Sequence, residues 1–286
     1  MIFISRKSYY FMRKGKKTHI ADNKDKETLT ETKLILRLII DLMLIPFRLI
    51  SVLFGKDEFR KVFTPFHTIF TELKKTPVSM YLILANTNAF LLSMFFPSNF
   101  LENLAVSANS FTNPISFISA GFLHASFAHF LGNMFFLFIF ARIVEKELGV
   151  KKTLFTYFSA MIISHILFSI VHYLLKSPSF GIGASGAISG MIATAMLLKP
   201  FKLTYAMIVP LPVMVVGWIA ISTDVAGLLD DSASGVSHIA HIGGFLSITL
   251  IMYLLGGDDK TILKKGLLIN GFSLLLYTIV AGLLTL

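Results

Sequence analysis

Seven long apolar segments dominate this chain of 286 residues and constrain its fold more than any other feature. Each approaches the ~20 residues that an α-helix needs to cross the hydrocarbon core of a bilayer. Because 55% of the residues are hydrophobic and 28 are phenylalanine, a soluble domain of this length would leave a large apolar surface in water. The sequence therefore predicts an all-α polytopic membrane protein, with spans at residues 78–96, 118–141, 153–175, 183–199, 203–222, 236–255 and 266–285.

Basic residues are unevenly distributed between the links that join these spans. Sixteen of the 26 Lys and Arg residues precede residue 77, and most of the others lie in alternate links. The intervening links carry one basic residue, Lys176, and the acidic residues Asp224, Asp230 and Asp231. Since Lys and Arg accumulate on the cytoplasmic side, we expect a cytoplasmic N-terminus and an external C-terminus. The same distribution indicates a lipid bilayer, and not nucleic acid, as the partner of a chain with net charge +10.

Residues 1–77 form a polar and basic region ahead of the first span. Within it, residues 33–54 are apolar but are interrupted by Arg37, Asp41 and Arg48, and a charge at the bilayer centre costs roughly 2.5–3.5 kcal/mol. We therefore expect a cytoplasmic region whose 33–54 helix lies in the membrane interface, with Arg37 and Asp41 paired on one face. This region has no apolar core long enough for a cleavable signal peptide. The compact loops and the absence of a transit peptide favour a bacterial inner membrane.

Polar side chains on three spans are expected to meet near the outer leaflet. The spans 118–141, 183–199 and 236–255 all run from outside to inside, so polar residues near their starts share one depth. These residues are His124, His129, Asn133, Ser185, His238 and His241. Such groups are costly in lipid and require one another or water as partners. No carboxylate is expected at this depth. The convergence predicts a buried polar site.

Ser185 is the candidate nucleophile of this site. It follows Gly183 and Ala184 and precedes Gly186, so its hydroxyl lies among small residues at the first turn of its span. The simpler interpretation is helix packing, because small residues also occur where two membrane helices approach closely. Ser189 is a second candidate, but it lies deeper and lacks the preceding Gly-x.

His241 is the candidate general base of the same site. A serine hydroxyl is a weak nucleophile, and a neutral imidazole can take its proton and return it to a leaving amine. Gly243 and Gly244 follow His241 and would allow its helix to approach the helix of Ser185. The two reacting groups are therefore expected within hydrogen-bond reach of each other.

The attack of a serine on a carbonyl creates an oxyanion that needs hydrogen-bond donors. His129 and Asn133 are four residues apart, so they share a helix face and can both donate, alongside the backbone N–H of the nucleophile. His124 lies about half a turn away from Asn133 and is expected at or above the start of the helix. His165 and His172 are interpreted as ordinary buried hydrogen-bonding residues.

These motifs together resemble the rhomboid family of intramembrane serine proteases. They are His124-x4-His129-x3-Asn133, Gly183-x-Ser185-Gly186 and Ala240-His241-x-Gly243-Gly244, with Arg142-x-x-Glu145 at the inner end of the second core span. The resemblance implies a six-helix core at 78–255 around a short, serine-bearing central helix, with a seventh span in 256–286. It also implies a Ser185–His241 dyad without an aspartate. Asn133, His129 and the backbone amides around Ser185 would form the oxyanion hole.

Three positions depart from the family pattern. The loop before the first motif usually carries a Trp-Arg pair, and here it carries Ile115-Ser116. Ser189 replaces a residue that is often aromatic, and Ile248 replaces a glycine seven residues after the catalytic histidine. None of these changes removes a reacting group, so the resemblance implies an active enzyme.

The predicted function is therefore that of a serine endopeptidase that cleaves the transmembrane segments of other membrane proteins near the outer leaflet. No cofactor or metal is expected. Substrates are expected to reach the site past span 203–222, where Pro210 and Pro212 would break the helix. One alternative is a non-catalytic rhomboid-like protein that binds membrane clients. Another is a haem or metal protein, which the lack of a carboxylate at site depth and of any cysteine disfavours.

Overall fold

The computed structural model describes residues 33–56, 58–206, 209–229 and 238–284. Its chain divides into two compact units, of which the first comprises residues up to Ile69 and Lys202–Leu211, and the second comprises Phe70–Phe201 and Pro212–Leu286. The basic segment 1–32, which the sequence analysis assigns to the cytoplasm, lies outside the described residues.

The first unit is built from short helices and a small sheet. Residues 33–43 are helical, and α2 (Ile45–Leu53), η1 (Phe59–Phe63) and the start of α3 (Thr64–Leu73) follow. Arg37 Nε lies 3.7 Å from Asp41 Oδ2, which confirms the predicted i,i+4 pair, and Arg48 binds the other oxygen of Asp41. The position of these helices in the membrane interface remains a prediction.

The apolar run 203–222 is a strand pair followed by a helix, and not one continuous span. β3 (Leu203–Ala206) pairs with β4 (Val209–Pro212), and α10 begins at Val213. Pro210 and Pro212 therefore precede α10 and cannot bend it, so that part of the prediction is wrong. The prolines fit the strand because it belongs to a two-stranded sheet, in which few backbone N–H groups are needed.

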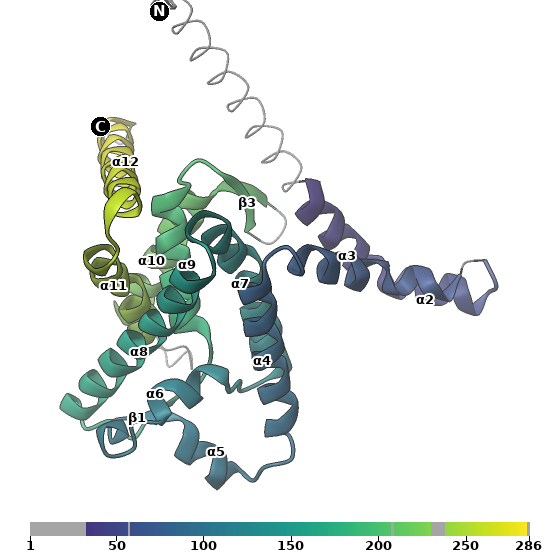
Figure 1. Cartoon of the computed structure of the whole chain (residues 1–286), viewed down its shortest axis with the longest axis horizontal. Helices are drawn as coiled ribbons and strands as arrows, with labels where there is room; N and C mark the ends of the chain where they lie inside the picture. The colour runs from purple at the N-terminus through teal and green to yellow at the C-terminus, as the bar shows by residue number, and fades with distance from the viewer. Residues whose placement is uncertain (1–32, 57, 207–208, 230–237, 285–286) are drawn as a thin grey trace, which may run out of the picture. The chain divides into compact units, whose positions relative to one another are not determined.

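The second unit is a helix bundle with a small irregular insertion. Its main helices are α4 (Pro77–Ser93), α7 (Phe127–Leu148), α8 (Val150–Leu174), α9 (Ser185–Leu198), α10 (Val213–Leu229), α11 (His238–Leu254) and α12 (Gly257–Leu284). Figure 1 labels them. In the described residues, three helices are long and apolar enough to cross a membrane: α7, α8 and the Gly257–Val280 part of α12. The helices α9, α10 and α11 are shorter and also apolar. The all-α fold of several apolar helices is confirmed.

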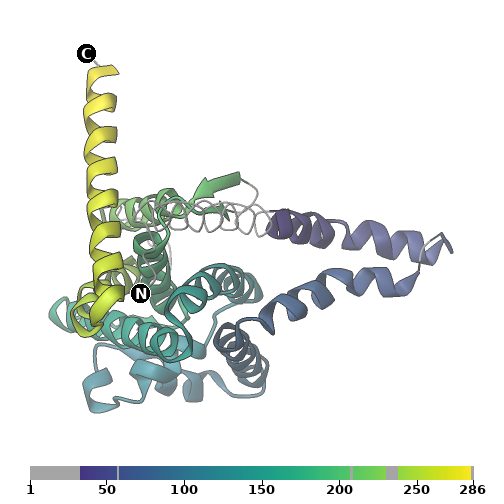
Figure 2. The same cartoon turned by 45° about the horizontal axis from the view of Figure 1, so that its top comes forward.

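The short helix α9 occupies the interior of this bundle. It contacts α7, α8, α10, α11 and α12, and each of its residues from Gly186 to Leu198 is buried. Figure 2 shows α12 as one long helix, and Asn270 in it donates a hydrogen bond of 3.0 Å to the carbonyl of Met196 at the end of α9. The first residue of the enclosed helix is Ser185. The fold therefore places this serine at one end of a helix that lipid cannot reach.

Between α4 and α7 the chain forms an irregular segment, which covers the link predicted before residue 118 and the first residues of the predicted span 118–141. It contains α5 (Ser98–Leu104), β1 (Val106–Ser107), η2 (Ser110–Thr112), α6 (Ser116–Ser119) and η3 (Ala120–Phe122). β1 pairs with β2 (Phe180–Gly181), which lies shortly before α9. Helix α7 itself begins nine residues later than the predicted start at residue 118, because Ser126 caps it and accepts a hydrogen bond from the backbone N–H of His129.

At the other end of α7, a buried carboxylate fixes the start of α4. The side-chain oxygens of Glu145 accept hydrogen bonds from the backbone N–H groups of Val78 and Ser79, at 2.9 and 2.8 Å, and from the hydroxyl of Ser79 at 2.7 Å. The first N–H groups of a helix have no partner within the helix, so Glu145 supplies the cap that Thr76 does not. Arg142 lies one turn away and pairs with Glu72 at 3.1 Å.

Candidate active site

The start of α9 is held in place by the turn that precedes it. Gly183 has φ +128°, a conformation that side-chain-bearing residues rarely adopt, and its N–H donates a 2.8 Å hydrogen bond to the carbonyl of Ala120. A Cβ atom on Gly183 would lie 2.9 Å from Nε2 of His129 and 3.8 Å from Oγ of Ser185. The imidazole of His129 and the hydroxyl of Ser185 therefore border the same small space. Ala184 is fully buried beneath them, whereas Ser185 is half-buried.

Glycines bring α9 into backbone contact with α11. A methyl group on Gly244 would overlap the carbonyl oxygen of Gly186, and one on Gly186 would lie 3.4 Å from the carbonyl oxygen of Ala240. Gly244 is three residues after His241, and Gly186 directly follows Ser185. The serine and the histidine therefore lie on touching turns of the two helices.

A third helix closes the same contact. A Cβ atom on Gly243 would lie 2.8 Å from the Cα atom of Ser164 in α8, and one on Gly186 would overlap the Ser164 hydroxyl. The Ser164 hydroxyl oxygen is buried and has no hydrogen-bond partner among the described residues. The three helices α8, α9 and α11 thus meet directly below the candidate nucleophile, with no space for larger side chains.

The polar residues of the first motif lie at the start of α7. His129 is on its first turn, and Asn133 Nδ2 donates a 2.9 Å hydrogen bond to the carbonyl oxygen of His129. An amide nitrogen carries two hydrogens, so Asn133 retains a second N–H for another acceptor. His124 precedes α7, as expected, and its ring packs edge-on against His129 with 5.3 Å between the ring centroids.

His124 is a buried side chain at the rim of this group. Only 7% of its surface is exposed, and neither ring nitrogen has a hydrogen-bond partner in the described part of the chain. Burial, and secondly the neighbouring His129, lower the pKa of His124 to about 4. His124 is therefore a neutral imidazole at neutral pH, and it supports the ring of His129 by contact rather than by charge.

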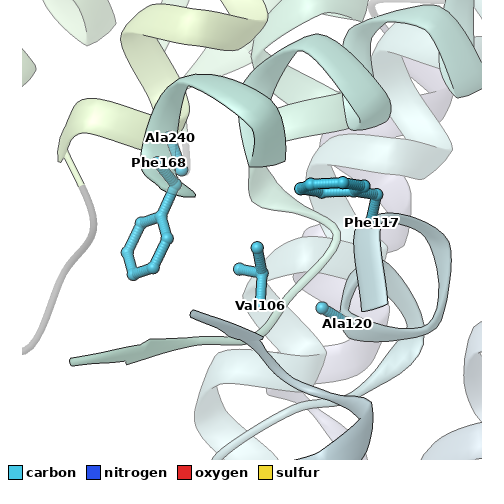
Figure 3. Close-up of a cluster of buried hydrophobic side chains, with 5 residues drawn as sticks. All are labelled: Val106, Phe117, Ala120, Phe168 and Ala240. Carbon is cyan, nitrogen blue, oxygen red and sulfur yellow. The ribbon is translucent and has the colours of Figure 1, made fainter. Parts of the chain in front are cut away.

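A cluster of apolar side chains attaches the irregular segment to the bundle. Figure 3 shows its five members, which come from β1, α6, η3, α8 and the first turn of α11: Val106, Phe117, Ala120, Phe168 and Ala240. All five are buried, and Ala240 directly precedes His241. The segment that lacks the usual Trp-Arg pair is therefore anchored by apolar packing. Of the two residues in that place, Ile115 is exposed and Ser116 is buried.

Asp224 joins the site, although the sequence analysis places it in an external link. Helix α10 extends to Leu229, and the Asp224 carboxylate within it is buried. Its Oδ1 atom lies 2.8 Å from Nδ1 of His241 and 2.9 Å from Nδ1 of His238. The expectation that no carboxylate lies at site depth is therefore wrong. Two histidines three residues apart on an apolar helix require a polar partner, and this requirement could have predicted a nearby carboxylate from the sequence.

The same three side chains are the types that bind transition metals. Asp224, His238 and His241 each offer one ligand atom, and these atoms lie within 4.8 Å of one another. The separations of 2.8 and 2.9 Å between imidazole nitrogen and carboxylate oxygen are those of hydrogen bonds. A carboxylate only accepts, so both imidazoles present Nδ1–H to Asp224 and leave Nε2 as the basic nitrogen.

The remaining candidates lie away from this group. His165 is buried, and its Nδ1 forms a 2.8 Å hydrogen bond with the carbonyl of Phe117. His172 packs on the ring of Phe168, with 4.1 Å between the ring centroids. Ser189 is buried one turn below Ser185 and faces Gly244. These contacts agree with structural roles for all three residues.

A bundle of apolar helices around a short, enclosed helix that begins at a serine defines a class of helical integral membrane proteins. A model of the Rhomboid domain matches residues 112–258, which is just over half of the chain. The chain belongs to the rhomboid family. The match also identifies the fold as the rhomboid-type helical bundle that the sequence analysis expects.

A relative from Arabidopsis thaliana, Rhomboid-like protein 11, chloroplastic, is 30% identical over 190 residues. The aligned region covers 61% of this chain and 64% of the relative, so the chain matches somewhat less than two thirds of that protein. Because the relative is a chloroplast protein, this comparison gives no support to the expected bacterial inner membrane. It does agree with the assignment to a family of integral membrane proteins.

Proposed function

We propose that this rhomboid is an intramembrane serine endopeptidase with Ser185 as nucleophile and His241 as general base. The observation that carries the proposal is the backbone contact between Gly186 and Gly244, which brings the start of α9 against the first turns of α11. This contact puts a half-buried hydroxyl beside a helix whose imidazole is oriented by hydrogen bonding.

The reaction follows the steps of acyl transfer. The oxygen of Ser185 attacks the scissile carbonyl carbon while its proton passes to Nε2 of His241. The C–N bond then breaks, and His241 returns the proton to the leaving amine, which gives an acyl-enzyme. Water next attacks the ester carbon, its proton passes to His241, and the serine is regenerated.

The oxyanion formed in each half of this reaction needs donors that are already in place. His129 borders the space above Gly183 together with the Ser185 hydroxyl, and Asn133 has a free amide hydrogen one turn below. The backbone N–H groups at the start of α9 point out of the helix and add the positive end of its dipole. We assign the oxyanion hole to Asn133, His129 and these amides, with His124 as a supporting residue.

The substrates of this reaction are transmembrane segments of other proteins, in keeping with a family that acts on membrane proteins in a lipid bilayer. A regular helix hides its carbonyl carbons, so cleavage requires local unwinding, and small or helix-breaking residues favour it. In our proposal the N-terminus is cytoplasmic and cleavage occurs near the outer leaflet. The basic region 1–77 faces anionic lipid headgroups.

The test is covalent labelling of the purified protein with a fluorophosphonate probe. The wild type reacts, because the serine oxygen displaces fluoride from phosphorus, whereas Ser185→Ala and His241→Ala do not. Ser189→Ala is the matched control, since it removes a hydroxyl from the next turn of the same helix, and it retains labelling. Thermal unfolding in detergent verifies that each variant is folded.

The alternative, a non-catalytic rhomboid-like protein that binds membrane clients, gives the opposite result. Folded wild-type protein would then fail to react, and Ser185→Ala would retain client binding in a pull-down of co-expressed membrane proteins. Failure of folded wild-type protein to react contradicts the enzyme assignment, whereas client binding by Ser185→Ala alone does not, because a protease that lacks its nucleophile can still bind its substrate.

A further inference from the structure

Asp224 is a buried acid within the apolar helix α10 and has two imidazoles as partners. Its side chain is 8% exposed, and one of its oxygens is shared by His238 and His241. A charge inside the bilayer region is costly, so a carboxylate at this place needs partners that compensate for its burial. A residue in an external link, where the hydropathy pattern predicts Asp224, would be exposed to water and would carry no such cost.

Residues of α10 and α11 that face each other around this carboxylate have complementary sizes and polarity. Asp224 and Gly227 are three residues apart and therefore lie on one face of α10, while His238 and His241 are three apart on α11. A methyl group on Gly227 would overlap the His238 ring, so the glycine makes room for it. Asp224 and Gly227 on α10 thus pack against His238 and His241 on α11.

We infer that Asp224 is the positioning residue of the proposed reaction, so that the site works as a Ser185–His241–Asp224 triad. This inference rests on the proposed function. By accepting from Nδ1–H, the carboxylate fixes the tautomer of His241 that has Nε2 free to take the serine proton. The two ring nitrogens lie on opposite edges of the imidazole, so Nε2 faces away from α10. Asp224 also stabilises the imidazolium that forms in each step.

His238 has a different part in the same network. It donates to the same oxygen of Asp224 as His241 does, and Gly227 of α10 contacts its ring. Its hydrogen bond holds the carboxylate between the two rings and restricts it to one rotamer. His129 of α7 is also within electrostatic range of His241, and it adds a donor but no negative charge. Among the described side chains around His241, Asp224 therefore supplies the anion.

The experiment compares fluorophosphonate inactivation of wild type, Asp224→Asn and Asp224→Glu in detergent, each after washing with EDTA. Asp224→Asn keeps the shape but can donate to His241 and favour the wrong tautomer. We expect its limiting inactivation rate to fall by about 10²–10⁴-fold while the half-saturating probe concentration stays within about threefold. We expect Asp224→Glu to be inactivated at least tenfold faster than Asp224→Asn because it restores the carboxylate. Asp258→Asn, which removes an exposed carboxylate from the first turn of α12, retains the wild-type rate.

A second measurement on wild-type protein does not depend on how the variants fold. In a sample with ¹⁵N-labelled histidine, a hydrogen bond to a carboxylate gives a downfield Nδ1–H resonance, and the signal of His241 is identified by its loss in His241→Ala. Its presence supports the inference, and its absence overturns it.

The outcomes separate the inference from the proposed function. If folded wild-type protein does not react with the probe, the enzyme assignment fails. If wild type reacts and a folded Asp224→Asn reacts at the same rate, only the role of Asp224 is overturned. Loss of wild-type reactivity after EDTA, restored by Zn²⁺, would assign Asp224 to a metal ion and would overturn it as well.

Discussion

Two buried carboxylates lie at opposite ends of the helix bundle and have opposite kinds of partner. Glu145, on the last turn of α7, accepts from backbone N–H groups of α4, whereas Asp224, in the second half of α10, accepts from two imidazoles. His129 on the first turn of α7 marks the Asp224 end, and 16 residues of helix separate it from Glu145, about 24 Å. Backbone partners cannot change their protonation state, but imidazoles can.

This difference indicates that the two ends of the bundle have different roles. A carboxylate that caps a helix stabilises one arrangement of two helices, and the nearby ion pair of Arg142 with Glu72 adds to it. In the proposed reaction, a carboxylate that binds an imidazole stabilises the imidazolium that forms in each step. We therefore expect changes at the Glu145 end to alter stability and changes at the Asp224 end to alter rate.

After Asp224→Asn, the largest loss of rate is expected for Asn133→Ala at the reactive end. Loss of one oxyanion donor should lower the rate of fluorophosphonate labelling by about 10²–10³-fold, and by less if His129 takes over. Asn86→Ala is the matched control, because both amides donate to the carbonyl four residues earlier, Asn86 at 2.8 Å and Asn133 at 2.9 Å. Asn86→Ala should alter thermal stability and leave the rate intact. Equal rates for the two variants would remove Asn133 from the site.

The next effect is expected for Glu145→Gln at the opposite end. The amide replaces one acceptor oxygen with an NH₂ group that faces donors, so the free energy of unfolding should fall by about 3 kcal/mol. The labelling rate of the folded fraction should stay that of the wild type. Glu102→Gln, at an exposed carboxylate, is the control for loss of a charge. If Glu145→Gln slowed labelling without loss of stability, the division between the two ends would be wrong.

A smaller effect is expected where α9 and α11 touch. Gly244→Ala puts a methyl group into the carbonyl of Gly186, so the helices must separate, and stability should fall by about 1–3 kcal/mol. In our proposal this contact aligns Ser185 with His241, so the labelling rate should fall too. Gly271→Ala in α12 is the control, since no atom lies within 4 Å of a Cβ built there. An unchanged rate in Gly244→Ala would show that the contact does not align the site.

The sequence predicts the parts of the site that depend on local spacing. Gly183, Ser185 and Gly186 lie within four residues, so their arrangement at the start of a helix follows from short-range geometry alone. The sequence also predicts that His124 precedes α7, because nine residues set it half a turn from Asn133. The rhomboid motifs and the all-α fold were predictable for the same reason.

The parts that were not predicted depend on contacts that hydropathy does not reveal. By hydropathy Asp224 ends an apolar run, but in the structure imidazoles of another helix bind its carboxylate and α10 continues for five more residues. Residues 203–212 are as apolar as a span, so hydropathy alone cannot distinguish a strand pair from a helix. For Asp224 the deciding partner lies on another helix, whereas β3 and β4 are neighbours in the chain and pair with each other, so hydropathy there leaves open a choice between two local structures.

The smallest effect is expected at His165, a buried histidine between the two ends. Its Nδ1 bonds to the carbonyl of Phe117, a member of the cluster in Figure 3 that anchors the segment before α7. His165→Leu leaves that carbonyl unpaired and should cost about 1 kcal/mol of stability, while His165→Asn can donate from nearly the same place and should cost less. The two are compared by thermal unfolding, with the labelling rate as second readout. A rate loss in His165→Leu that His165→Asn reverses would mean that this segment positions the reacting groups, and the reactive end would then extend as far as α8.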